Sequence, residues 1–175
     1  MLNIVLHEPE IPFNTGAIGR TCVAAGVRLH LIEPFGFILS DRYIKRAGMD
    51  YWDRLDLTKY VDYEAFLEAH PDLTPGGSGD GPHLWFATTK APQTYADVRF
   101  GPDDFIMFGK ESAGIPEEIL APYPDACIRI PMFEDTRSLN LSNSAAIILY
   151  EALRQNDFAS LEKTGQLHRL SWNRQ

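Results

Sequence analysis

Residues 128–143 read IRIPMFEDTRSLNLSN and lead into the apolar stretch AAIILYEAL at residues 145–153. A β-type run meets Pro131, and polar residues 135–138 follow. The helix that comes next has three candidate N-cap residues, Asn140, Ser142 and Asn143. This order predicts a strand, a polar loop and the N-terminus of a long helix. In open parallel α/β sheets ligand sites lie beyond the carboxyl ends of strands, so we expect a site here.

The N-terminal quarter alternates between apolar runs and helical patterns. We predict strands at residues 2–6 and 27–32. Between them, Asn14 or Thr15 is expected to cap a helix that ends at Gly26. A basic helix is expected to start at Ser40 or Asp41 and to end near Gly48. Because strand, helix, strand and helix follow one another, the fold class is predicted to be α/β, with a parallel sheet flanked by helices.

The same reading extends to the rest of the chain. Expected elements are a possible strand at residues 57–61, a helix at 63–70, strands at 84–87 and 104–108, a short helix at 115–120 and a helix from about 143 to 155. Residues 71–82 are rich in glycine and are expected to form a flexible surface loop. They are not expected to be a domain boundary, because the chain on either side could not hold a core alone. We therefore predict one domain over residues 1–156, followed by a C-terminal tail at 157–175.

The composition is that of an ordinary globular protein. The 175 residues are 45% hydrophobic and 23% charged. No apolar run is long enough to cross a bilayer, and the first ten residues are acidic where a signal peptide would be basic. The two cysteines form no pair, and the histidines lack ligand spacing. We expect a cytoplasmic protein with no membrane contact and no metal.

The formal charge of −8 argues against a nucleic-acid partner, because polyanions bind to basic surfaces. A local patch can still bind in spite of an acidic remainder. The candidate patch is Arg42, Lys45 and Arg46, with Arg20 and Arg28 upstream. A solvated basic helix face explains this spacing equally well.

Three loops that follow predicted strands share one composition. They span residues 87–90, 109–114 and 130–140, and each is small or polar. Such loops let backbone N–H and C=O groups approach a ligand without obstruction by side chains. Any one of them alone would be read as an ordinary turn. Together they suit a flat heterocycle that is bound by main-chain groups.

Three ordered motifs then give a family resemblance. They are NTGxxxR at residues 14–20, FGxExxG at 108–114, and IPM with SLNxSN at 130–143. The set resembles the SpoU branch of the SPOUT RNA methyltransferases. Residues 1–48 look most like the small tRNA 2′-O-methyltransferases that modify a wobble cytidine or uridine. Two departures are Lys110, where the family often has proline, and a longer loop at 71–82.

The resemblance implies features that patterns alone do not give. The C-terminal segment would thread through a loop to form a deep trefoil knot, and the protein would be an obligate homodimer. A partner subunit agrees with the final helix, which is apolar around much of its circumference. The cofactor would be S-adenosyl-L-methionine. Its expected contacts are Ala87, Gly109, Ile130, Ser138 and Leu139.

The implied reaction is methyl transfer to the ribose 2′-hydroxyl of the wobble nucleotide in a tRNA anticodon loop. Arg20, Glu111 and Asn140 are the candidate catalytic residues. A guanidinium stays protonated, so Arg20 would polarise the hydroxyl or clamp a phosphate rather than act as a base. Each residue also has a simpler reading: a surface arginine, an exposed carboxylate and a helix cap.

Several alternatives stay open at this point. The chain could methylate another tRNA or rRNA site, or it could bind RNA without catalysis. A Rossmann-type nucleotide enzyme would also fit the alternation, although residues 14–19 lack the glycine fingerprint. If the protein binds a tRNA anticodon loop, we expect a basic patch that spans the dimer to bind it. The patch comprises Arg20, Arg28, Arg42, Lys45, Arg46 and Arg137.

Overall fold

A computed structural model describes residues 1–38, 51–77 and 79–172. The basic helix expected between Ser40 and Gly48, with Arg42, Lys45 and Arg46, lies outside the described residues. The helices, strands and contacts named below all lie within these ranges.

The centre of the fold is a parallel sheet in the order β3-β2-β1-β6-β5-β4, with β7 also paired to β5. All six strand pairs are parallel. The strands are β1 Asn3–His7, β2 Arg28–Ile32, β3 Leu57–Tyr60, β4 Thr74–Pro75, β5 His83–Ala87, β6 Phe105–Phe108 and β7 Cys127–Ile128. The predicted parallel α/β fold is therefore confirmed.

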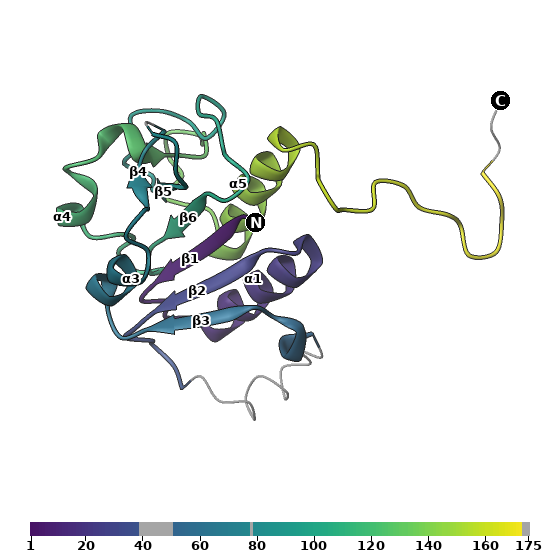
Figure 1. Ribbon diagram of the computed structural model, residues 1–175, viewed down its shortest axis with the longest axis horizontal. Helices are drawn as coiled ribbons and strands as arrows, with labels where there is room; N and C mark the ends of the chain where they lie inside the picture. The colour runs from purple at the N-terminus through teal and green to yellow at the C-terminus, as the bar shows by residue number, and fades with distance from the viewer. Residues whose placement is uncertain (39–50, 78, 173–175) are drawn as a thin grey trace.

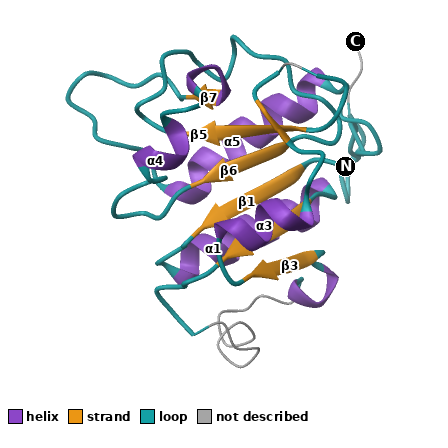
Figure 2. Cartoon of the chain, turned by 60° about the vertical axis from the view of Figure 1, so that its left-hand side comes forward, coloured by secondary structure: helices purple, strands orange, loops and turns teal. Residues whose placement is uncertain are grey.

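Helices cover both faces of the sheet (Figures 1 and 2). They are α1 Pro12–Ala25, α3 Tyr63–Ala69, α4 Glu117–Leu120 and α5 Leu141–Gln155, with 3-10 turns at Trp52–Arg54 and Pro124–Ala126. Strand residues alternate between the two faces. In β1, Ile4 and Leu6 pack in the core below α1 and α5, whereas Val5 packs with Phe66 of α3. Because both faces are buried, the central strands are mostly apolar, with Asn3, His7 and His30 as buried polar exceptions.

Two predicted boundaries need correction. Helix α1 begins at Pro12, with Ile11 as its N-cap, so Asn14 and Thr15 lie buried inside the helix instead of capping it. Proline suits the first turn of a helix because its missing N–H would have no partner there. The loop expected at residues 71–82 contains the short strand β4, which pairs with β5.

No helix in the described ranges is long and apolar enough to span a membrane. After α5, Phe158 and Leu161 still pack against the core. Figure 1 shows the chain beyond them leaving the body as an extended arm. Leu167, Leu170 and Trp172 on this arm are exposed.

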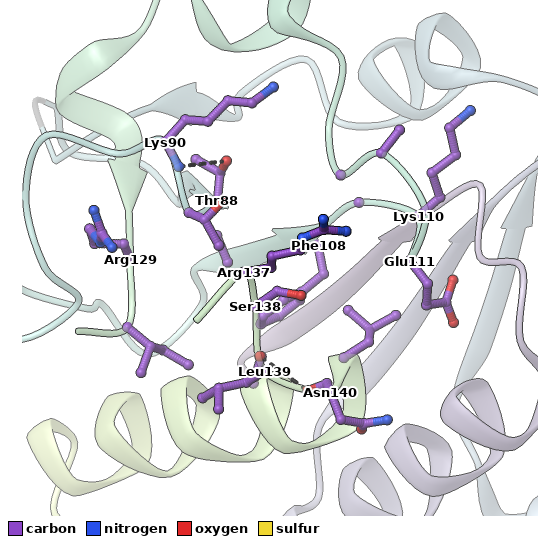
Figure 3. Close-up of a pocket in the computed structure, with 18 of the residues that line it drawn as sticks. Thr88, Lys90, Phe108, Lys110, Glu111, Arg129, Arg137, Ser138, Leu139 and Asn140 are labelled. Carbon is purple, nitrogen blue, oxygen red and sulfur yellow. Dashed lines mark hydrogen bonds between the residues drawn. The ribbon is translucent and has the colours of Figure 1, made fainter. Parts of the chain in front are cut away.

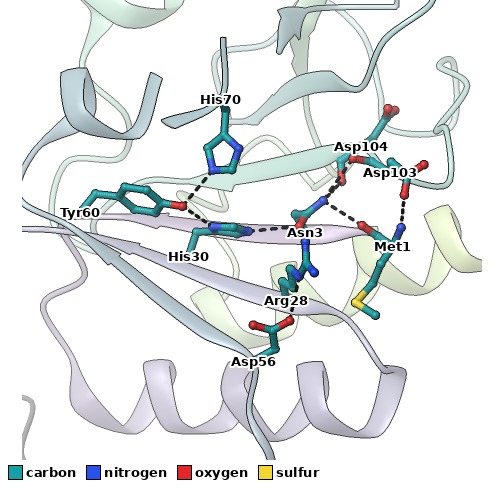
Figure 4. A network of polar contacts seen from close by, with 9 residues as sticks. All are labelled: Met1, Asn3, Arg28, His30, Asp56, Tyr60, His70, Asp103 and Asp104. Atoms are coloured by element: carbon teal, nitrogen blue, oxygen red, sulfur yellow. Dashed lines mark hydrogen bonds and ion pairs between the residues drawn. The ribbon is translucent and has the colours of Figure 1, made fainter. Parts of the chain in front are cut away.

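A buried polar chain crosses one face of the sheet (Figure 4). The Asn3 amide nitrogen donates to backbone carbonyls, so its oxygen accepts from Nε2 of His30 at 3.1 Å. Burial lowers the pKa of His30 to about 4, so the ring is neutral at pH 7 and its Nδ1 accepts from the Tyr60 hydroxyl at 2.9 Å. The Tyr60 oxygen in turn accepts from Nε2 of His70 at 2.9 Å. This order requires His30 to be neutral.

Protonation of His30 at low pH should therefore lower the free energy of unfolding. Burial, with His70 and Arg28 nearby and only Asp56 opposing, lowers the pKa of His30 from 6.5 to about 4. The unfolded chain binds more protons between these values, so stability falls as pH drops through this window. We expect a loss of about 2 kcal/mol between pH 7 and pH 5, measured by urea unfolding. His30→Gln should show a shallower pH dependence, and an identical slope in both proteins would contradict this assignment.

Candidate functional site

A cavity of about 470 Å³ lies beyond the carboxyl ends of β1, β5, β6 and β7. Its walls are the three loops predicted from the sequence, together with the first turns of α1 and α5. Figure 3 shows Lys90 and Arg129 on one side and Lys110 and Glu111 on the other, with Arg137 between them. The volume is in the range of small-molecule and cofactor sites.

Seven of the eight predicted site residues line this cavity. They are Ala87, Gly109, Ile130, Ser138, Leu139, Glu111 and Asn140. Arg20 is not among the lining residues. It is exposed on α1, with its guanidinium carbon 5.6 Å from the centre of the Tyr51 ring. Arg20 lies six positions after Asn14, so the two residues are roughly 9 Å apart along the helix axis.

Gly109 has no room for a side chain. A Cβ atom added there would lie 2.0 Å from the carbonyl carbon of Gly114 and 2.1 Å from the nitrogen of Ile115. Both obstacles are backbone atoms, so neither can rotate away. The loop therefore folds back on itself at the end of β6, and it exposes main-chain groups to the cavity.

A chain of side-chain hydrogen bonds joins three walls of the cavity. Asn140 donates through Nδ2 to Oδ1 of Asn14 at 2.9 Å, and Asn14 donates to Oε1 of Glu111 at 2.9 Å. The Glu111 carboxylate also accepts from the backbone N–H groups of Glu10, at 2.8 Å, and Ile11, at 3.2 Å. Glu111 thus fixes the two residues that lead into α1.

Asn140 is also the N-cap of α5. Its side-chain oxygen accepts from the backbone nitrogens of Ser142, at 2.9 Å, and Asn143, at 3.3 Å. One amide group therefore both caps a helix and ties it to α1. The helix cap that the sequence offered as the simpler reading of Asn140 is present, together with the side-chain bond to Asn14.

Sequence reasoning did not identify Asn14 as a site residue. The NTG motif contained it, but a local rule assigned its side chain to a helix cap. Asn14 is only 7% exposed, and both ends of its amide are used in the chain between Asn140 and Glu111. Pro12, which favours the first turn of a helix, was the sequence signal that would have placed Asn14 inside the helix.

Two further contacts fix the loop after β6 to the loop after β1. The Glu10 carboxylate accepts from both the N–H and the hydroxyl of Ser112, each at 2.8 Å. These bonds lower the pKa of Glu10. Lys110 pairs with Glu8 at 2.8 Å, which raises the pKa of Lys110. The Lys110 ammonium is therefore held by a carboxylate at the end of the neighbouring strand.

The cavity has apolar and cationic parts. Ile128, Ile130, Leu139, Leu141 and Ile148 supply apolar surface, and Arg129 and Arg137 supply cations. Lys90 is paired with Glu117 at 2.7 Å. Arg28 of the predicted basic patch is paired with Asp56 at 2.8 Å. The cavity, with its apolar walls and its two arginines, suits a flat organic ligand held by main-chain groups, with an anionic molecule at its mouth.

The residues described here contain no group of three or more His, Cys, Asp or Glu side chains placed to hold a metal ion.

Comparisons with known proteins agree with this geometry. Residues 1–150 match the model of the SpoU rRNA Methylase family. A tRNA (cytidine(34)-2′-O)-methyltransferase of Escherichia coli K12 is 47% identical over 157 residues, which are 89% of this chain and 94% of the relative.

Two solved structures also resemble the chain. One, concerned with 2-OH methylation of C/U34 on tRNA, has a TM-score of 0.79 and 40% identity, and the match covers 90% of this chain and 97% of the other. An AdoMet-bound rRNA methyltransferase from Sinorhizobium meliloti has a TM-score of 0.69 and 26% identity, and the match covers 87% and 56%.

The steric limit at Gly109 gives a test of the loop. Gly109→Ala should lower the free energy of unfolding by about 3 kcal/mol or more, because backbone must move to admit the methyl group. Gly165→Ala is the matched control, since its Cβ meets no atom within 4 Å. Urea denaturation of both variants measures the difference. Equal stability of the two would show that the loop accommodates a side chain.

Proposed function

The chain belongs to the SpoU rRNA Methylase family, and from this premise we propose that it methylates the ribose 2′-hydroxyl of the wobble nucleotide of tRNA. The target is a cytidine or uridine at position 34, as the names of the similar proteins indicate. The observation that carries the proposal is the cavity that brings together seven predicted site residues. A tRNA substrate also implies a cytoplasmic location.

The residues around the cavity fit S-adenosyl-L-methionine. Ala87 and Gly109 bring no bulky side chain to the cavity wall, and Leu139 and Ile130 offer apolar faces to a purine. Ser138 and the backbone of the three loops supply polar partners. When bound, the cofactor supplies an electrophilic methyl group on a sulfonium.

The chain's own residues then have three tasks. Glu111, Asn14 and Asn140 hold the walls in one arrangement, so the donor and acceptor can be aligned without further reorganisation. The apolar side chains exclude water from the reacting atoms. Arg137, at the cavity wall, places positive charge where the ribose oxygen becomes more negative during transfer.

We assign Arg20 to the RNA rather than to the donor cavity. Its guanidinium is exposed and is absent from the cavity lining. A permanently charged, planar group in that position suits a phosphate of the anticodon loop. This keeps the phosphate-clamping role expected from the sequence and moves it away from the methyl donor.

The proposal includes the trefoil knot. After β7, Arg129 pairs with the segment at residues 93–94, through its N–H to the Gln93 carbonyl at 3.1 Å and a bridge to Thr94. The chain then passes along the cavity and returns as α5 against α1. Such a return path beside two earlier loops is what threading through them requires.

The proposal also includes a homodimer. Ile147 and Tyr150 on α5 are 38% and 45% exposed, and Ile11 and Phe13 at the start of α1 are 44% and 78% exposed. Because α1 and α5 pack together, these side chains belong to two adjoining helices. A second copy would cover this apolar surface.

The proposed function is tested by mass spectrometry of tRNA from a strain that lacks this protein. We expect the loss of one ribose methylation, at position 34, and its return when the purified protein and S-adenosyl-L-methionine are added. Methylation at another tRNA or rRNA position would assign a different target. No lost methylation anywhere would indicate an RNA-binding protein without catalysis.

Arg20 provides a separate prediction on activity. Arg20→Ala should raise the KM for tRNA about tenfold, as expected for loss of a charged phosphate contact, and should leave the affinity for S-adenosyl-L-methionine unchanged. Arg99→Ala removes another exposed arginine, outside the cavity, and serves as the control. Full activity of Arg20→Ala would remove this assignment, and weakened cofactor binding would return Arg20 to the donor site.

A further inference from the structure

Phe133 is the most exposed large apolar side chain among the described residues, at 91%. It lies in a turn that is closed by a hydrogen bond from the Thr136 N–H to the Phe133 carbonyl at 3.0 Å. Met132 and Arg137, on either side of this turn, both line the cavity. The turn is therefore attached at both ends to the cavity wall, and the Phe133 side chain is exposed to solvent between them.

The proposed reaction determines what must occupy this mouth. The accepting oxygen has to come within about 3–3.5 Å of the methyl carbon, so the target ribose enters the cavity mouth. The base is attached to that ribose and must lie a few ångströms from it. In a single-stranded loop the base is free to leave its neighbours and to stack on an aromatic side chain.

Charge on the turn distinguishes the base from the phosphates as the partner of Phe133. Glu134 and Asp135 follow Phe133 directly, and both are exposed. Two carboxylates repel the phosphate groups of RNA, whereas the face of an uncharged base is not repelled. A phenyl ring gains contact with any base because every base has a π-face.

We propose that Phe133 is the stacking platform for the base of the nucleotide whose ribose is methylated. The inference rests on the proposed function and names a specificity-determining residue for it. Phe133 would hold the base outside the cavity and thereby orient the attached 2′-hydroxyl toward the donor.

The test uses the full-length protein and two synthetic forms of the tRNA identified by mass spectrometry. One form is intact, and the other keeps the ribose of nucleotide 34 but lacks its base. Phe133→Ala should lose about 5- to 100-fold in kcat/KM on the intact tRNA. The wild type should lose a similar factor on the abasic tRNA, and the variant should lose nothing further there. Phe133→Trp should restore activity.

Thr136→Ala is the matched control, because it removes an exposed side chain from the same turn and should keep full activity. Cofactor affinity and sedimentation should be unchanged in Phe133→Ala. Unchanged activity of Phe133→Ala on intact tRNA, or an equal loss on both tRNAs, would overturn this inference and leave the proposed function standing. Dissociation of the variant into monomers would assign Phe133 to the subunit interface instead. A wild type that leaves nucleotide 34 unmethylated would refute the proposed function and this inference together.

Discussion

The hydrogen-bonded chain from Asn140 through Asn14 to Glu111 is the constraint on which the site depends. Its two bonds join residues that are 126 and 97 positions apart in the sequence. Each partner belongs to a different segment: the N-terminus of α5, the first turns of α1 and the loop after β6. Because the walls of the cavity come from separate segments, their spacing is set by these amides and by the Glu111 carboxylate, not by any one element.

The parallel sheet could be predicted because its central strands are buried on both faces and are therefore mostly apolar. The start of α5 was also readable, since Asn140 follows a local capping rule. The start of α1 was not, because its N-cap Ile11 makes no side-chain cap bond and the segment before the helix is fixed by Glu111, about a hundred residues away. Asn14 was missed for the same reason: no local pattern shows that an amide inside a helix bonds to two distant loops.

The site combines residues that cannot be replaced for different physical reasons. Gly109 is required by backbone packing and needs no contact with a ligand. Asn14 and Glu111 are required by the geometry of their hydrogen bonds. The family resemblance predicted which backbone positions would meet at the cavity, whereas the placement of Arg20 outside it required the structure. The proposed function requires this acidic protein to bind RNA locally, and the cations around the cavity and the exposed Phe133 are the residues that we propose for this contact.

The most direct measurement of the central claim is the dissociation constant for S-adenosyl-L-methionine in Asn14→Ala, determined by calorimetry. Thr15→Ala is the matched control, because its buried hydroxyl has no hydrogen-bond partner within the described part of the chain. If Asn14 holds the cavity walls together, its variant should bind the cofactor about tenfold more weakly, a loss of about 1.4 kcal/mol, while Thr15→Ala binds normally. Equal affinity in both folded variants would contradict the account.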